Sequence, residues 1–503
     1  MDKRKSILNV SVSIISKIFT AIAVIVVRRI LISSCGNEVN GLNSLYLSIV
    51  GFLAVTELGV GNAITFCMYK PIVEGDKNKV SALYHLFRKL YLIIGGVILA
   101  CGLMITPFIS YFAKDYAEIN VNLYLTFVLM LISVVVTYLF SAKTALLNAY
   151  KNNYISTAIT SAGMLFQYIL QIAVLLITGS FVGYLVSRTI AASAQWLITD
   201  IVTRKKYSPI LSNKQKVDNS TKKELVKNIK AMFAHKIGYL LVNTTDSLVI
   251  SIFIGVVVLG KYSNYTTIMG TLSEILKLVF TSLTSVLGHL YVEENKETTK
   301  KYCESFHFLN FTIGAVFFLG YYAIIDNLIS ILFSADLIVS KSVTFVITLN
   351  GFVQFMRQST LSFRDATGTF YNDRFKPLIE GPTNIILSVI LVNFIGVTGV
   401  IAATVITNLI ICHVIEPYVL YKNAFAASPK KYYIQNYSMI ALFTLALIVL
   451  ELCMRSVTNQ WLELLVNGLI SVGVFVVIFV IAVIFNKDLF EILVLKFKER
   501  RKK

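Results

Sequence analysis

Long apolar runs separated by short polar segments dominate the pattern of the chain. A helix that crosses a membrane needs about 20 mostly apolar residues. The pattern predicts fourteen such spans, near 8–31, 43–69, 90–112, 122–146, 154–178, 181–203, 232–258, 262–290, 306–333, 342–363, 377–394, 397–421, 437–456 and 464–486. The runs lack the alternation of a membrane β-barrel, so we expect an all-α integral membrane protein. Gly179, Gly396 and Gly399 predict tight turns where two spans follow closely.

Basic residues are unevenly distributed between alternate loops. With a cytoplasmic N-terminus, most of the 46 lysines and arginines fall in cytoplasmic segments. The outer loops then hold only Lys114, Lys261, Lys341 and Arg455. Cytoplasmic loops of membrane proteins carry such an excess. The pattern therefore predicts an even number of spans, with both termini on the cytoplasmic side of the membrane.

Composition supports the same class of protein. Hydrophobic residues make up 56% of the 503 residues and charged residues 15%, with a mean hydropathy of +0.73. Soluble domains are about 45–50% apolar and 25% charged. The net charge of +19 does not indicate nucleic-acid binding, because the basic residues lie between apolar spans. The six scattered cysteines predict neither disulfides nor a zinc site.

An internal repeat organises the spans. Shifted by 219 residues, segment 17–53 aligns without gaps over 236–272, and ten of the 37 positions match. The matches include three glycines near the outer turn between the first two spans. The related helices are six spans apart along the chain. Because six is an even number, the two copies cross the membrane in the same direction and run parallel. We therefore expect two six-helix lobes, at 1–205 and 232–425, a basic cytoplasmic linker at 206–231 that contacts lipid headgroups, and two extra helices with a basic tail at 426–503.

Several basic residues lie inside predicted spans, where a charge costs about 2.5–3.5 kcal/mol. Lys17 and Arg28 are eleven residues apart, so they share one face of a helix. Lys236 is the repeat mate of Lys17, and Arg188 lies between Ser187 and Thr189. Together they predict a basic patch in a wet cleft, although snorkelling to the interface or internal ion pairs would also explain such charges.

Two acidic residues inside spans are candidates for an ion or gating site. Asp246 ends the polar run Asn243–Asp246, and Glu57 precedes two glycines that interrupt the second span. Asp246 could instead balance Lys236 or Lys17 in a structural role. Neither a phosphate-binding loop nor a histidine-based metal motif is present, and no outer loop is long enough for a catalytic domain. The sequence thus predicts no catalytic residue, metal or cofactor, and a protein that is not an enzyme.

Four stretches resemble the Wzx-type flippases of polysaccharide repeat units, within the multidrug/oligosaccharidyl-lipid/polysaccharide exporter superfamily. They are Glu57–Ala63, Leu147–Tyr154, Lys236–Asp246 and Gly260–Tyr265. The resemblance implies a two-lobed bundle that alternates between inward- and outward-open states. It also implies a substrate of undecaprenyl-pyrophosphate carrying an oligosaccharide, destined for O-antigen or capsule, with polymerase machinery as a further partner.

A pyrophosphate is anionic, and basic side chains in a wet cleft can pair with it. We therefore expect Lys17, Arg28, Arg188 and Lys236 to hold the substrate. A cation-coupled multidrug antiporter of the same superfamily is the alternative, and it would need Asp246 or Glu57 as a titrating carboxylate. A membrane-embedded polymerase or ligase is a third hypothesis, which the repeat and the short outer loops disfavour.

Overall fold

The computed structural model describes residues 3–54, 60–116, 119–213, 217, 244–369 and 372–491, and all regular elements there are helices. The chain divides into two compact units, Met1–Gly260 and Lys261–Lys503. Side chains are described from residue 19 onward, except at a few positions of α3 and α10. The predicted boundaries of the lobes, the linker and the C-terminal region stay a prediction.

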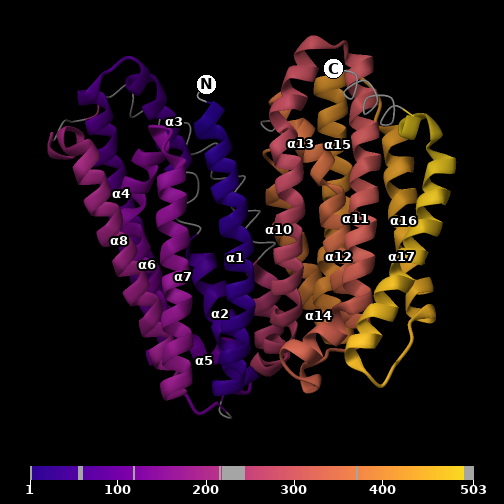
Figure 1. Cartoon of the computed structure of the whole chain (residues 1–503), viewed down its shortest axis with the longest axis horizontal. Coiled ribbons are helices and arrows are strands. Elements are labelled where there is room, and N and C mark those ends of the chain that lie inside the picture. Colours follow the sequence, from indigo (N-terminus) through magenta and orange to yellow (C-terminus); the bar gives the residue numbers. More distant parts are fainter. Residues whose placement is uncertain are drawn as a thin grey trace. The chain divides into compact units, whose positions relative to one another are not determined.

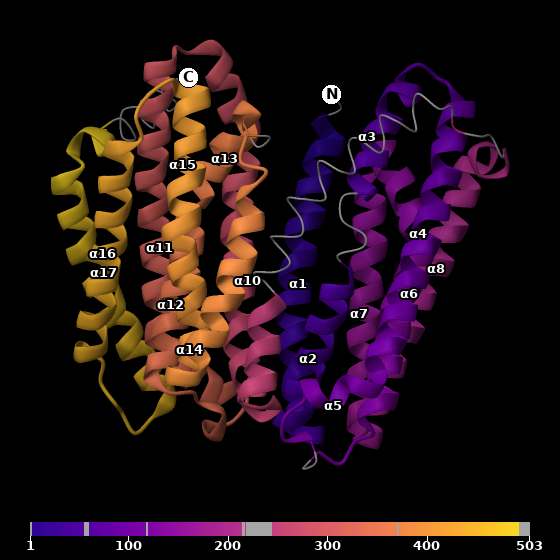
Figure 2. The same cartoon turned by 180° about the vertical axis from the view of Figure 1, so that it is seen from behind.

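The first unit is a bundle of long helices. Its elements are α1 (Lys3–Cys35), α2 (Asn37–Leu53), α3 (Val60–Val73), α4 (Lys77–Ile105), the 3₁₀ turn η2 (Thr106–Phe108), α5 (Ile109–Phe112), α6 (Leu123–Ala149), α7 (Asn153–Thr178) and α8 (Phe181–Ser212). Helix α8 packs against both α6 and α7, and α7 also packs against α1 (Figures 1 and 2). The ends of these helices have local causes: Asn122 caps α6, Ser180 caps α8, and Gly179 ends α7 in the left-handed conformation.

The segment at 244–260 belongs to this unit through hydrogen bonds. A short apolar helix, Thr244–Phe253, precedes α10 (Val256–Glu293). The Ser251 hydroxyl donates to the Phe112 carbonyl at 2.6 Å, and the Lys114 ammonium donates to the Phe253 carbonyl at 3.0 Å. The Val256 amide donates to the Lys114 carbonyl at 3.3 Å. The segment is thereby joined to the connection that follows α5.

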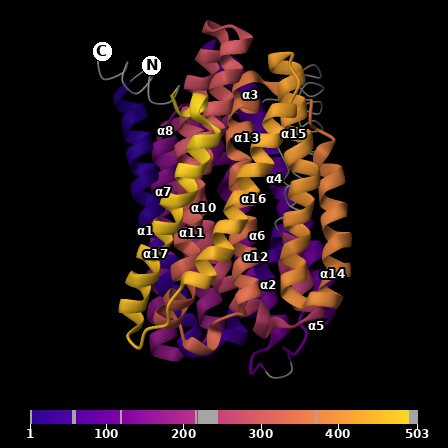
Figure 3. The ribbon, with the colours of Figure 1, turned by 90° about the vertical axis from the view of Figure 1, so that its right-hand side faces the viewer.

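The second unit is built around α11. After α10 it contains α11 (Lys296–Leu332), the 3₁₀ turn η4 (Ala335–Leu337), α12 (Lys341–Met356), α13 (Gln358–Thr367), α14 (Lys376–Thr407), the π-helical turn η6 (Asn408–Cys412), α15 (His413–Leu420), the π-helical turn η7 (Tyr421–Phe425), α16 (Lys430–Cys453) and α17 (Gln460–Phe485). Helix α11 packs against α12, α13, α16 and α17 (Figure 3). Phenylalanines fill this core, and the rings of Phe352 and Phe443 stack with centroids 3.6 Å apart.

The helices confirm the predicted all-α membrane fold. In the described part of the chain, seven helical segments are long and apolar enough to cross a membrane, and one of them, Lys376–Phe425, holds two predicted spans in 50 residues. The predicted turn between those two spans falls at Gly396, where φ is 59° inside α14. The predicted boundary between 232–258 and 262–290 is a few residues late, because the helix break lies at Gly255.

Positions related by the 219-residue repeat have the same local structure. Gly36 and Gly255 both have positive φ, at 89° and 140°, and each directly precedes a helix. The repeat mates Gly41 and Gly260 then pack reciprocally. A Cβ on Gly41 would collide with the Val256 carbonyl oxygen, and one on Gly260 would collide with the Asn37 carbonyl oxygen. Because Asn37 and Val256 are also repeat mates, the contacts between residues 37–41 and 256–260 within the first unit are reciprocal.

Candidate functional site

The structure describes the surroundings of two of the four predicted basic site residues, Arg28 and Arg188. Lys17 lies in α1, but its side chain is outside the described part of the chain. Lys236 and Glu57 are also outside the described residues. Asp246 is buried in the short helix Thr244–Phe253, with 8% of its surface exposed.

Arg28 and Arg188 lie at matching depths in the first unit. Arg28 is seven residues before the end of α1, and Arg188 is seven residues after the start of α8. Gln171 is likewise seven residues before the end of α7, which packs against both α1 and α8. At 1.5 Å per residue, all three lie about 10 Å from the helix ends, toward the middle of the bundle.

These residues belong to one polar layer, made of Arg28, Tyr168, Gln171, Tyr184 and Arg188. Tyr184 lies near both arginines, and Tyr168 lies near Arg188. Gln171 is fully buried, and its Nε2 donates to the Tyr184 carbonyl at 3.4 Å. Among the described residues, no carboxylate lies within ion-pair distance of Arg188.

The polar layer can attract an anion. A guanidinium presents several N–H donors in a rigid fork that matches phosphate oxygens. Arg28 and Arg188 are partly exposed, whereas the neighbouring Arg29 is exposed. An anionic group that enters the layer would meet two cations and neutral hydrogen-bonding groups. The tyrosines and Gln171 were not predicted as site residues, although their polarity within an apolar helix is visible in the sequence.

In the second unit, a group of positively charged residues is paired with carboxylates. Arg357, Lys376, Glu380 and Glu416 form a charge quartet at the junction of α12, α14 and α15. Arg357 binds Glu416 with two hydrogen bonds of 2.6 and 3.1 Å. Lys376 lies 2.7 Å from Glu416 and 2.8 Å from Glu380. Two cations face two carboxylates, so the quartet is neutral as a whole.

Two other basic residues inside predicted spans, Arg357 and Lys143, form ion pairs in the structure. In the sequence, Arg357 forms a polar stripe with Gln354 and Gln358, and either helix packing or a substrate path would explain that stripe equally. In the structure, Arg357 forms an internal ion pair with Glu416. Lys143, near the end of a predicted span, does not extend to solvent. Its side chain is only 12% exposed, and its ammonium pairs with Asp200, which also binds Arg204 at 2.7 Å.

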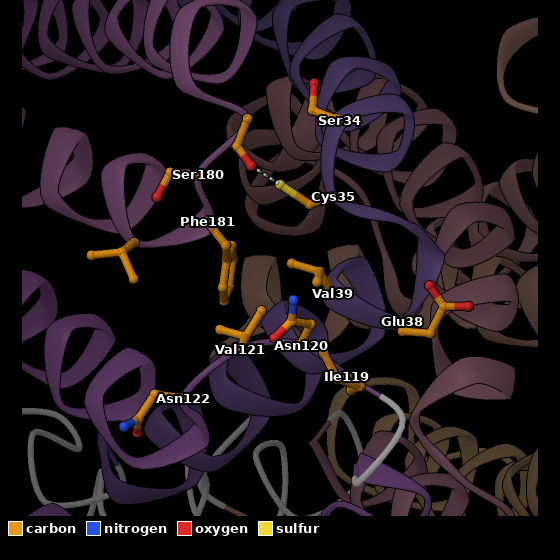
Figure 4. A pocket seen from close by; sticks show the side chains of 12 residues that line it. Ser34, Cys35, Glu38, Val39, Ile119, Asn120, Val121, Asn122, Ser180 and Phe181 are labelled. Atoms are coloured by element: carbon orange, nitrogen blue, oxygen red, sulfur yellow. Dashed lines mark hydrogen bonds between the residues drawn. The ribbon is translucent and has the colours of Figure 1, made fainter.

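A cavity of about 530 Å³ lies at the end of the first unit where α1 and α7 end. It is lined by Ser34, Cys35, Glu38, Val39, Ile119, Asn120, Val121, Asn122, Gly179, Ser180, Phe181 and Val182. In Figure 4, Val39, Asn120, Val121 and Phe181 come together in the middle of the view. The dashed line marks the Cys35 thiol donating to the Gly179 carbonyl at 3.2 Å.

Comparisons with known proteins identify the fold. No protein-family model and no curated protein match the sequence. Among solved structures, the lipid II flippase MurJ in an inward closed conformation is similar, with a TM-score of 0.68 and 14% identity, over 96% of this chain and 100% of that one. A multidrug resistance MATE family transporter of the MOP superfamily is also similar. Its inward-facing structure gives a TM-score of 0.60 at 14% identity, over 85% of this chain and 98% of that one. The chain is therefore a multi-pass membrane protein with the transporter fold found in MurJ and the MATE transporters.

Proposed function

We propose that this protein translocates undecaprenyl-pyrophosphate-linked oligosaccharide repeat units across the bacterial cytoplasmic membrane by alternating access, for surface polysaccharide biosynthesis. The observation that carries the proposal is the polar layer. It holds two arginines near Tyr184, and Arg188 has no carboxylate at ion-pair distance among the described residues. The fold supports the proposal, because one protein that shares it is a lipid II flippase.

The chemistry of the substrate explains why such a layer is needed. A pyrophosphate must cross a region where an isolated charge is costly. Arginines can replace part of its hydration, because charge-assisted hydrogen bonds are roughly twice as strong as neutral ones. In this proposal Lys17 continues the same face of α1, about 16 Å from Arg28 along the helix axis. Lys236, its repeat mate in the sequence, contributes a second ammonium group.

A multidrug antiporter is the second candidate function, because MATE transporters share the fold. Such a transporter would need a carboxylate that titrates during the cycle. Asp246 is the candidate within the described part of the chain, and Glu57 is the candidate outside it. The arginines of the polar layer would repel a cationic drug, so the layer favours the flippase.

Deleting the gene in its host tests the proposed function. The amount of lipid-linked oligosaccharide on each membrane face is measured, together with surface polysaccharide. We expect the oligosaccharide to accumulate on the cytoplasmic face and the surface polymer to be lost. Complementation with Arg29→Ala should restore export, because that side chain is exposed, whereas the Lys17→Ala/Arg188→Ala double variant should not restore it. Normal polymer combined with new sensitivity to cationic drugs would instead establish the antiporter, and Asp246→Asn would then abolish drug resistance.

A further inference from the structure

The cavity at the end of the first unit is amphipathic. Its floor is apolar, since Val39 and Phe181 are 2% and 3% exposed. Its rim is polar, with Asn120 and Asn122 exposed and Glu38 partly exposed. Ligand pockets of about 300–1,000 Å³ commonly combine apolar walls with a few polar groups that fix orientation. At about 530 Å³, this cavity is within that range.

The rim has unused hydrogen-bonding capacity. Among the described residues, the Asn120 amide and the Glu38 carboxylate have no hydrogen-bond partner. Asn122 uses its Oδ1 to cap α6, accepting from the Leu125 amide at 3.0 Å, so its NH₂ group stays available. The rim thus offers two amide donors together with amide and carboxylate acceptors. A ligand rich in hydroxyl groups can use both kinds.

The charge of the cavity lining disfavours the pyrophosphate part of the proposed substrate. None of the twelve lining residues is a lysine or arginine, and Glu38 is acidic. A phosphate group would meet a carboxylate here rather than a cation, which is unfavourable. The arginines lie deeper, because Arg28 precedes Cys35 by seven residues, which is about 10 Å along α1. The cavity therefore lies closer to the helix ends than the polar layer does, on the same helices, α1 and α8.

We propose that this outer cavity is a subsite for the neutral sugar portion of the substrate. This inference rests on the proposed function, in which the pyrophosphate binds at Arg28 and Arg188. Sugar hydroxyls bind the rim amides and the Glu38 carboxylate, and the less polar face of the ring packs on Val39 and Phe181. A sugar held in this cavity places the oligosaccharide near the helix ends, with the polar layer between it and the middle of the bundle.

Cys35 lines the cavity and serves as a native reporter of its occupancy. The test uses full-length protein in proteoliposomes with Cys67, Cys101 and Cys453 changed to serine, and follows labelling of Cys35 by a membrane-impermeant maleimide. The matched control keeps Cys453, which is exposed at the end of α16, and carries Cys35→Ser. The ligands are two neutral disaccharides, maltose and N,N′-diacetylchitobiose, one anionic disaccharide, digalacturonate, and the cationic drug ethidium.

We expect a neutral disaccharide to slow labelling of Cys35 and to leave labelling of Cys453 unchanged. At about ten times its Kd, a bound ligand leaves roughly one tenth of the sites free, so labelling slows about tenfold. Asn120→Ala and Glu38→Gln should each weaken this protection, since both change the rim without touching the bundle core. Conversely, no protection by either neutral sugar, equal protection at Cys453, or protection only by digalacturonate or ethidium would overturn the subsite.

The outcome separates this inference from the proposed function. If Arg28→Ala and Arg188→Ala block translocation while no sugar protects Cys35, the sugar subsite is wrong and the flippase function stands. If a neutral sugar protects Cys35 while both arginine variants translocate normally, the cavity binds sugar and the pyrophosphate site is wrong.

Discussion

The two units of the chain place the cations inside their helix bundles in different surroundings. In the second unit, Arg357 binds Glu416 through two hydrogen bonds, and Lys376 lies within 2.8 Å of two carboxylates. In the first unit, Arg28 and Arg188 lie near Tyr184, and Arg188 has no ion pair among the described residues. The residue types are the same, but Arg357 and Lys376 have carboxylate partners, whereas Arg188 has none among the described residues.

The difference assigns different roles to the two groups. A balanced, hydrogen-bonded cluster offers little attraction to an external anion, because its charges already cancel. It stabilises the packing of α12, α14 and α15, and each member becomes costly to remove. A cation such as Arg188, which has no ion pair among the described residues, keeps its attraction for an anion. The quartet is therefore structural, and in our proposal the polar layer is the functional region.

The largest effect should come from removing one charge of the quartet. Glu416 is 1% exposed. Glu416→Gln keeps its size but leaves Arg357 and Lys376 with a single carboxylate. Breaking a buried ion pair in this way costs about 3–5 kcal/mol of unfolding free energy. Thermal unfolding of the purified protein in detergent measures this loss. Glu491→Gln, in an exposed pair with Lys487, is the control, and an equally small loss for both variants would contradict a structural quartet.

A double variant checks that charge balance is the cause. Arg357→Met/Glu416→Gln removes one cation and one carboxylate, which leaves Lys376 beside Glu380 at 2.8 Å. The remaining pair is neutral, so the double variant should be more stable than Glu416→Gln alone. If the losses of unfolding free energy from the two single substitutions simply add in the double variant, Arg357 and Glu416 act independently. The second unit would then not differ from the first in how its cations are held.

The polar layer should show the opposite behaviour. Arg188→Ala removes a cation that has no ion pair among the described residues, so the unfolding temperature should change little. A hydrogen bond to a charged group contributes about 2 kcal/mol, so loss of the pyrophosphate contact should slow translocation about thirtyfold. Flipping of a fluorescent lipid-linked oligosaccharide in proteoliposomes measures the rate. Arg29→Ala is the matched control, and equal rates for the two variants would remove Arg188 from the site.

The two regions also show which features the sequence alone predicts. The apolar runs predict the helices, because spanning length and turn glycines such as Gly179 and Gly396 act locally. The repeat even predicts matching turns at Gly36 and Gly255. The partner of Arg357, however, is 59 residues away, and no periodicity indicates that contact. Arg188 and Arg357 therefore look alike in the sequence, and only the tertiary packing separates them.

A carboxylate placed in the polar layer should make the first unit resemble the second. Gln171 is fully buried and contacts Tyr184, which lies near both arginines. Gln171→Glu is nearly isosteric and would partly neutralise the layer. We expect the translocation rate to fall about tenfold, for a loss of about 1.4 kcal/mol, with no loss of unfolding temperature. Gln171→Met removes the same hydrogen bond without adding charge, so an equal fall in that variant would show that charge is not the cause.

The smallest effect concerns the ion pairs that the first unit does contain. Lys143 and Asp200 are partly exposed, at 12% and 17%, and Arg204 is 74% exposed. Asp200 follows Arg188 by twelve residues, which is about 18 Å along α8. Because solvent reaches this cluster, Asp200→Asn should lower the unfolding free energy by only about 1 kcal/mol. Translocation should stay at the wild-type rate, since the substituted side chain lies far from the polar layer. A translocation defect larger than that of Arg188→Ala would reverse the comparison. It would mean that the cluster of Lys143, Asp200 and Arg204, rather than the polar layer, is where the first unit contacts its substrate.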